Sequence, residues 1–170
     1  MFFLRKAKQQ DPLAFTMSGV RMGERALQIG IDDTSLAAAI AAKVGLSGHA
    51  AIAVADEASA ARARAAIAKA ATLADVHVTA LDALPLADGT FDLVVVHTIS
   101  DWLGALPEAA RVAVLGEGRR VLRVGGRLVL IESASRPAVA LEALGAAGFR
   151  PARLLAERDG TRFCEGLKTS

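Results

Sequence analysis

The sequence lacks the residues on which several kinds of site depend. Its 170 residues contain one cysteine, Cys164, so no disulfide can form within the chain and no CxxC metal motif is present. The net charge of +2, without a basic tract, argues against an extended nucleic-acid interface. The apolar start, Met1–Leu4, is far too short to cross a bilayer, and cations follow it, an order that does not fit a secretory signal. We therefore expect a cytoplasmic protein with no metal site, no nucleic-acid partner and no transmembrane segment.

Hydrophobic residues are abundant, in contrast. They make up 53% of the chain, which is enough for one well-filled core, and a length of 170 residues fits a single domain. Pro12 interrupts the pattern near the start of the chain. We predict an N-terminal helical segment over residues 1–22, followed by the main domain over residues 23–170.

Apolar runs alternate with alanine-rich runs along the main domain. The alternation predicts a doubly wound α/β fold, with a mostly parallel sheet and helices on both faces. Near the end, Arg158-Asp-Gly160 is a hairpin signal, which places one antiparallel strand near an edge of the seven-stranded sheet. The predicted strands are 26–29, 50–55, 76–80, 91–96, 127–132, 151–157 and 161–167, and the predicted helices are 36–44, 58–72, 107–124 (with an interruption near Gly116 and Gly118) and 137–147.

The chain is organised around its first strand–turn–helix unit. The strand at 26–29 runs into Gly30, two aspartates and Thr34, and the next helix ends at Gly45. This order is typical of nucleotide-binding α/β domains, and Asp33 or Thr34 can cap the helix. A full G-x-G-x-x-G is missing, and Asp32 and Asp33 would repel a pyrophosphate at the helix N-terminus. The unit therefore favours a cationic ligand over NAD or FAD.

Four later stretches resemble the class I S-adenosylmethionine-dependent methyltransferases. The resemblance covers residues 19–168 and implies a Rossmann-like methyltransferase fold. It also implies methyl transfer from S-adenosylmethionine to an acceptor that the sequence does not identify. The stretches are Arg120-Val-Leu-Arg-Val-Gly-Gly-Arg-Leu-Val-Leu130, Asp82-Ala-Leu-Pro-Leu-Ala-Asp-Gly-Thr-Phe-Asp-Leu-Val-Val95, Gly145-Ala-Ala-Gly-Phe149 and Phe163-Cys-Glu-Gly-Leu-Lys168.

The cofactor loop departs from the family pattern. The family usually has an acidic residue on the first strand and then three glycines at alternate positions, whereas this chain has Gln28, Gly30, Asp32 and Thr34. The degenerate loop leaves two functions open. The protein is a methyltransferase, or it keeps the fold without catalysis and works as a binding or partner module.

The resemblance also implies particular cofactor contacts. Gly30, the first glycine of the loop, and Asp32 would contact the cofactor, and Asp32 and Thr34 put side chains where its methionine part would lie. Asp56, with Glu57 as a rival, would accept hydrogen bonds from the ribose hydroxyls. Asp82 would reach the adenine amino group, with Ala83 against the ring. The alternatives are a helix cap for Asp56 and a solvated loop carboxylate for Asp82.

His97 is the candidate catalytic residue and a further candidate cofactor contact. It follows the fourth strand, and ligands in open α/β sheets bind beyond the carboxyl ends of strands. Its imidazole could orient or deprotonate an acceptor. Trp102 could form an apolar wall beside it. The alternative for this stretch is loop packing and a helix cap.

Overall fold

The computed structural model describes residues 12–170 as seven strands and five helices. Residues 1–11 of the predicted N-terminal helical segment lie outside the described residues, and the rest of that segment contains one short helix. The elements in chain order are α1 (Pro12–Ser18), β1 (Arg25–Ile29), α2 (Thr34–Val44), β2 (His49–Val54), α3 (Glu57–Lys69), β3 (Asp75–Val78), β4 (Phe91–Thr98), α4 (Glu108–Val121), β5 (Leu122–Ser133), α5 (Ala140–Ala146), β6 (Ala152–Arg158) and β7 (Thr161–Leu167).

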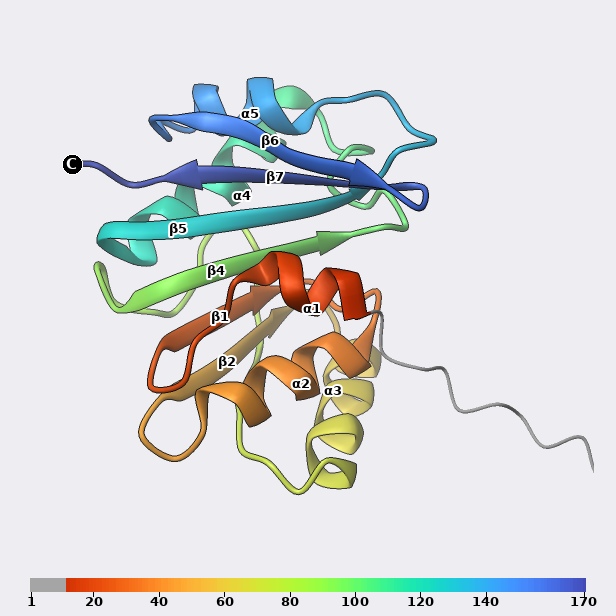
Figure 1. The fold of residues 1–170 in the computed structure, drawn as a ribbon, viewed down its shortest axis with the longest axis vertical. Helices are drawn as coiled ribbons and strands as arrows, with labels where there is room; N and C mark the ends of the chain where they lie inside the picture. Colours follow the sequence, from red (N-terminus) through yellow and green to blue (C-terminus); the bar gives the residue numbers. More distant parts are fainter. Residues whose placement is uncertain (1–11) are drawn as a thin grey trace, which may run out of the picture.

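The strands form one sheet in the order β3-β2-β1-β4-β5-β7-β6. Strand β4 lies at the centre and pairs in parallel with β1 and β5, β1 pairs in parallel with β2, and β7 runs antiparallel to both β5 and β6. Figure 1 shows β7 pointing against its neighbours. The predicted doubly wound α/β fold, with one antiparallel strand near an edge, is confirmed.

Helices cover both faces of the sheet. Helices α1, α2 and α3 lie in front of it in Figure 1, and α4 and α5 lie behind. Strand β4 supplies both apolar layers, because Val95 packs into the cluster under α2 and α3 while Val94 and Val96 pack into the cluster under α4 and α5. This explains why Leu93–Val96 is an unbroken apolar run, as in strands buried on both faces.

The paired glycines do not precede the fifth strand as predicted. Strand β5 begins at Leu122, directly after α4, and Gly125 and Gly126 lie inside it. The pairing of β4 with β5 slips between Phe91 and Leu93, so the segment around the glycines bulges out of the ladder. Gly125 has a φ of +81°, which favours glycine at the bulge. Apolar periodicity does not reveal such a slip, because it depends on pairing with another strand.

Helix α4 is continuous, contrary to the predicted interruption at its two glycines. Gly118 is buried against the sheet, where an added Cβ would lie 2.9 Å from Leu128 Cδ1, whereas an added Cβ at Gly116 would have no neighbour within 4 Å. Gly118 allows α4 to pack closely on the sheet, whereas Gly116 only adds backbone freedom to the unfolded chain.

Replacing Gly116 with alanine should therefore stabilise the protein. Alanine is favoured over glycine in a helix interior by about 0.5–1 kcal/mol, and the site has room for the methyl group. Urea denaturation followed by circular dichroism measures the change. Gly118→Ala in the same helix is the matched control and should not stabilise, because its methyl group meets Leu128. Equal gains in both variants would contradict this account.

Candidate functional site

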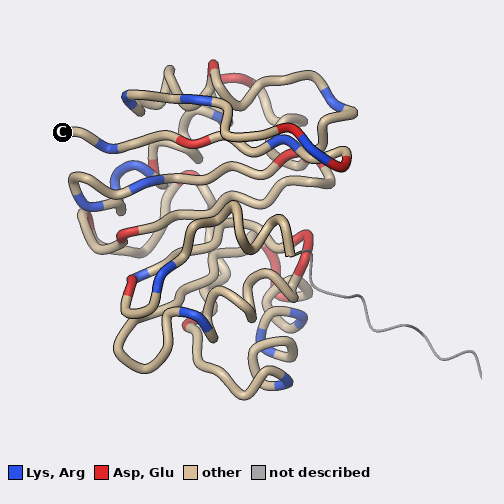
Figure 2. The backbone as a smooth tube through the Cα atoms, in the orientation of Figure 1, with Lys and Arg blue, Asp and Glu red and all other residues tan. Residues whose placement is uncertain are grey.

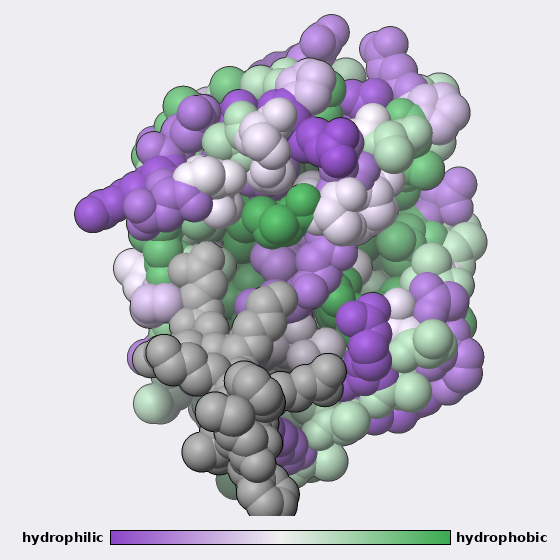
Figure 3. Space-filling model, turned by 90° about the vertical axis from the view of Figure 1, so that its right-hand side faces the viewer, coloured by the Kyte–Doolittle hydropathy of each residue, from purple (hydrophilic) through white to green (hydrophobic). Residues whose placement is uncertain are grey.

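A cavity of about 220 Å³ opens where the carboxyl ends of β1, β2 and β4 meet. Figure 3 faces this side of the molecule and shows hydrophobic residues at its centre among hydrophilic ones. Figure 2 shows acidic positions along the same margin of the sheet. The lining residues are Gly30, Ile31, Asp32, Val54, Ala55, Asp56, Ser59, Arg62, Leu81, Ser100 and Trp102.

The turn after β1 forms the first wall of the cavity. Gly30 adopts a φ of +75°, and its N–H donates to the carbonyl of Ala53 at 2.9 Å, which ties the turn to β2. Asp33 then caps α2 by accepting from the Ser35 N–H at 2.9 Å. The sequence left this cap open between Asp33 and Thr34, and the structure assigns it to Asp33.

Gln28 lies beneath this turn. Its side chain is 2% exposed, and Nε2 donates to the carbonyl of Gly30 at 3.1 Å. Its Oε1 has no hydrogen-bond partner among residues 12–170. A buried acceptor without a partner is unfavourable, and Gln28 itself does not line the cavity.

The loop after β4 closes over the same turn. Asp32 Oδ2 accepts from the Ser100 N–H at 2.7 Å, and Asp32 Oδ1 accepts from the Ser100 hydroxyl at 2.8 Å. The indole of Trp102 packs on Gly30, where an added Cβ would lie 2.8 Å from its Cζ2 atom. Its Nε1 donates to the carbonyl of His97 at 2.9 Å. In this structure Asp32 binds the loop, and Trp102 covers the glycine turn.

Asp56 forms the wall of the cavity at the end of β2. Its exposed carboxylate caps α3, with Oδ1 accepting from the Ser59 N–H at 2.7 Å and Oδ2 from the Ser59 hydroxyl at 3.0 Å. The Ser59 backbone N–H, followed by the Ser59 hydroxyl, holds the pKa of Asp56 below its usual range. The carboxylate is therefore ionised at neutral pH and accessible from the cavity. Glu57 does not line the cavity and pairs with Arg64 at 2.6 Å.

The structure brings Gly30, Asp32 and Asp56 together but does not bring Asp82, Ala83 or His97 to the cavity wall. Asp82 and Ala83 are exposed on the loop that follows β3. His97 is 5% exposed near the end of β4. Ser59, Arg62 and Ser100 were missed by the sequence analysis, because serine and arginine in polar loops and helices carry no distinctive signal.

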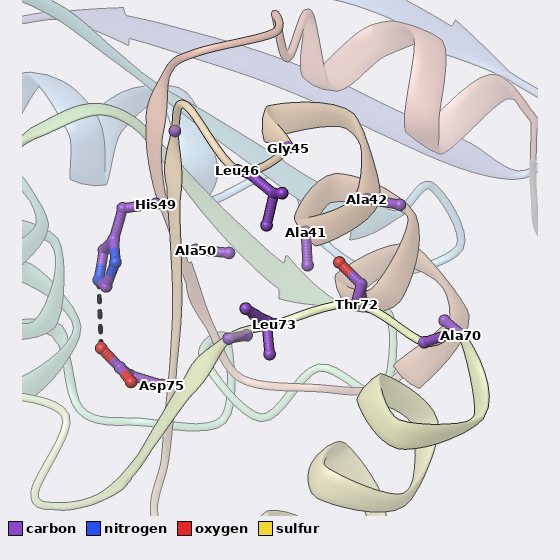
Figure 4. A pocket seen from close by; sticks show the side chains of 13 residues that line it. Ala41, Ala42, Gly45, Leu46, His49, Ala50, Ala70, Thr72, Leu73 and Asp75 are labelled. Carbon is purple, nitrogen blue, oxygen red and sulfur yellow. Dashed lines mark ion pairs between the residues drawn. The ribbon is translucent and has the colours of Figure 1, made fainter.

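A second hollow lies at the opposite end of the sheet. It encloses about 660 Å³ and is lined mainly by alanine and glycine, with Leu46 and Leu73 at its margin (Figure 4). His49 Nε2 and Asp75 Oδ2 lie 3.3 Å apart beside it. Although it is larger, it lies at the amino ends of β2 and β3. Ligands of open α/β sheets bind at the carboxyl ends, so the smaller cavity is the candidate site.

Within residues 12–170, no group of three or more histidine, cysteine, aspartate or glutamate side chains could hold a metal ion. No helix in this part of the chain is both long and apolar enough to cross a membrane.

The sequence matches the family model described as a methyltransferase domain over residues 27–130. This match spans more than half of the chain, and the structural neighbours include many S-adenosylmethionine-dependent enzymes. The chain therefore belongs to the class I S-adenosylmethionine-dependent methyltransferase family. No curated protein sequence matches it significantly.

Solved structures share the fold at low sequence identity. A SAM-dependent methyltransferase from Aquifex aeolicus superimposes with a TM-score of 0.78 at 16% identity, covering 92% of this chain and 88% of the other. A TehB-like SAM-dependent methyltransferase from Corynebacterium glutamicum gives 0.69 at 17% identity, covering 92% and 87%. A Haloferax volcanii protein solved in complex with the Trm112 methyltransferase activator gives 0.67 at 16% identity, covering 93% and 88%.

Proposed function

We propose that the protein transfers a methyl group from S-adenosylmethionine to an acceptor. The observation that carries this proposal is the convergence of the Gly30 turn and the ionised, accessible Asp56 carboxylate on one cavity at adjacent strand ends. In a Rossmann-like fold, a glycine turn after the first strand and an acidic residue after the second are the groups that approach a bound nucleoside.

The Asp56 carboxylate fits this cofactor in chemical terms, because it offers an anionic acceptor to ribose hydroxyls. S-adenosylmethionine, when bound, supplies an electrophilic methyl group. We keep Asp82 and Ala83 as proposed adenine contacts, which would require their loop to approach the cavity.

The contribution of the protein to such a reaction is mainly positioning. Holding a nucleophile in line with a methyl group removes most of the entropic barrier to their meeting. His97 is the proposed contact to the acceptor and would act as a base only if the acceptor has to lose a proton. Because its side chain is buried, the loop over it would have to move before the imidazole could reach an acceptor.

Calorimetric titration with S-adenosylhomocysteine tests cofactor binding directly. We expect saturable binding in the micromolar range, weakened about tenfold in Asp56→Asn through loss of a charge-assisted acceptor. Asparagine still caps α3, so folding should be preserved. The matched control is Asp33→Asn, which alters the cap of α2 outside the cavity. If no heat of binding is detected at millimolar S-adenosylhomocysteine, the enzyme proposal is wrong.

A binding or partner module without catalysis is the second candidate. Asp32 and Thr34 place side chains at the two loop positions where the family has glycine, and this favours lost cofactor binding. The Haloferax neighbour, bound to an activator, is an example of this fold engaged with another protein. Failure of both the wild type and Asp32→Gly/Thr34→Gly to bind S-adenosylhomocysteine would favour this candidate.

We further propose a cytoplasmic location, supported by the single thiol of Cys164.

A further inference from the structure

We propose that residues Ser100–Trp102, here called the latch loop, close the cofactor cleft and must be released before the cofactor can bind. This inference rests on the proposed binding of S-adenosylmethionine and describes how access to that same site is regulated. It assigns a role to Asp32 and Trp102 that differs from direct cofactor contact.

The first part of the latch is the attachment of Asp32 to Ser100. One carboxylate accepts both the backbone N–H and the hydroxyl of a residue that is 68 positions away in the sequence. Hydrogen bonds to an ionised acceptor are about twice as strong as neutral ones. Position 32 is one where the family usually has glycine, and glycine has no side chain that could reach Ser100. The departure from the family pattern therefore creates the attachment.

The second part is the indole on the glycine turn. Trp102 Cζ2 and Nε1 would both lie 2.8 Å from an added Cβ at residue 30, so only glycine lets the ring come this close. The indole N–H is satisfied by the carbonyl of His97 at 2.9 Å. The face of Gly30 that a ligand would approach is thus already in contact with the chain's own side chain.

The third part is the space that remains. The cavity beside the latch loop holds about 220 Å³, below the range of about 300–1,000 Å³ for typical ligand sites, and an open hollow of about 450 Å³ shares Asp32 and Arg62 with it. Trp102 and Ser100 both line the cavity, so moving the latch loop would enlarge it. Ser100 is exposed, and Asp101 adopts a φ of +67°, in the left-handed region that aspartate enters more readily than most residues.

Both ends of the latch loop are fixed by hydrogen bonds to its neighbours. The Ala105 N–H donates to the Asp101 carbonyl at 2.9 Å, and the Leu103 N–H, just after the loop, donates to the hydroxyl of Thr98 on β4 at 3.1 Å. Between these fixed ends, the attachments of the loop to the cofactor turn are the Asp32 carboxylate and the indole contact.

Trp102 is the only tryptophan in the chain, which makes it a specific fluorescent probe of the latch. We expect the emission of the wild type to shift to longer wavelength when S-adenosylhomocysteine saturates the protein. Asp32→Ala should produce part of this shift without ligand and should raise the acrylamide quenching of Trp102 about twofold. By calorimetry, Asp32→Ala and Trp102→Ala should each bind S-adenosylhomocysteine about tenfold more tightly, because apparent affinity scales with the fraction of open protein.

Ile99→Ala is the matched control, since Ile99 precedes the latch loop, is partly exposed and does not line the cavity. It should leave affinity, emission and quenching unchanged. Weaker binding by Trp102→Ala would mean that the indole is a wall of the cofactor site, and saturation without an emission shift would mean that the loop stays in place. Either result overturns the latch and leaves the proposed cofactor intact. If neither the wild type nor either latch variant binds, the proposed function fails and the latch fails with it.

Discussion

Replacing Arg162 with alanine is expected to lower the free energy of unfolding by about 3–5 kcal/mol at neutral pH, because it leaves a buried charge unpaired. Arg162 Nη1 donates to Glu132 Oε1 at 2.8 Å across β5 and β7, and both residues are less than one tenth exposed. Glu157, whose side chain is half exposed, is a second partner at 3.1 Å and should contribute little. Urea denaturation followed by circular dichroism measures the loss.

The loss of stability in Arg162→Ala should be larger at pH 7 than at pH 5. Burial raises the pKa of Glu132, even though the Arg162 guanidinium opposes the shift. For a carboxyl group whose pKa is higher in the folded state, stability falls as pH rises from the unfolded pKa through the folded one. Removing Arg162 raises the pKa of Glu132 further, so the variant should be more stable at pH 5 than at pH 7.

The double variant Glu132→Gln/Arg162→Ala is the control for this pair. It removes both charges and should recover much of the stability lost in Arg162→Ala, because neutral replacements leave no buried ion. Its stability should also change little between pH 5 and pH 7. If Arg162→Ala loses the same amount at both pH values, the unpaired Glu132 carboxylate is not the cause.

Replacing Phe149 with alanine is expected to lower the free energy of unfolding by about 3–5 kcal/mol through the cavity it leaves. The ring is completely buried just after α5 and lies against Gly166 on β7, where an added Cβ would be 2.6 Å from its Cγ atom. Leu141→Ala, on the exposed side of α5, is the control and should change stability by less than about 0.5 kcal/mol. Comparable losses in the two variants, measured by urea denaturation, would contradict a cavity at Phe149.

Phe149 and Gly166 both lie in stretches of the sequence that resemble the methyltransferase family. Gly145–Phe149 and Phe163–Lys168 were matched to the last helix and the last strand of the family, and the structure packs the ring of Phe149 on Gly166. The alternation of strands and helices and the position of the hairpin were also predictable. Each depends on local apolar runs and turn residues that alternate regularly along the chain.

The candidate site was only partly predictable. Gly30 and Asp56 follow strands directly, so their placement at adjacent strand ends follows from the parallel sheet. The pairing of Asp32 with Ser100 joins two loops that are distant in the sequence, and no local pattern encodes it. The cap formed by Asp56 was one of two expected roles, and the structure shows that one carboxylate can cap α3 while it faces the cavity. The proposed contacts to a cofactor stay predictions.

The place of β7 in the sheet has a consequence for synthesis of the chain. Strands β1 and β2 are neighbours and follow one another in the chain, whereas β5 is made before β6 and its partner β7 is made only after β6. Until residues 161–167 are made, a nascent chain has an open edge along β5, whose residues Leu128–Ile131 are almost completely buried in the finished protein. An open apolar edge invites pairing with other chains. Strand β7 therefore covers this edge of β5 and removes a site at which the growing chain could pair with another chain.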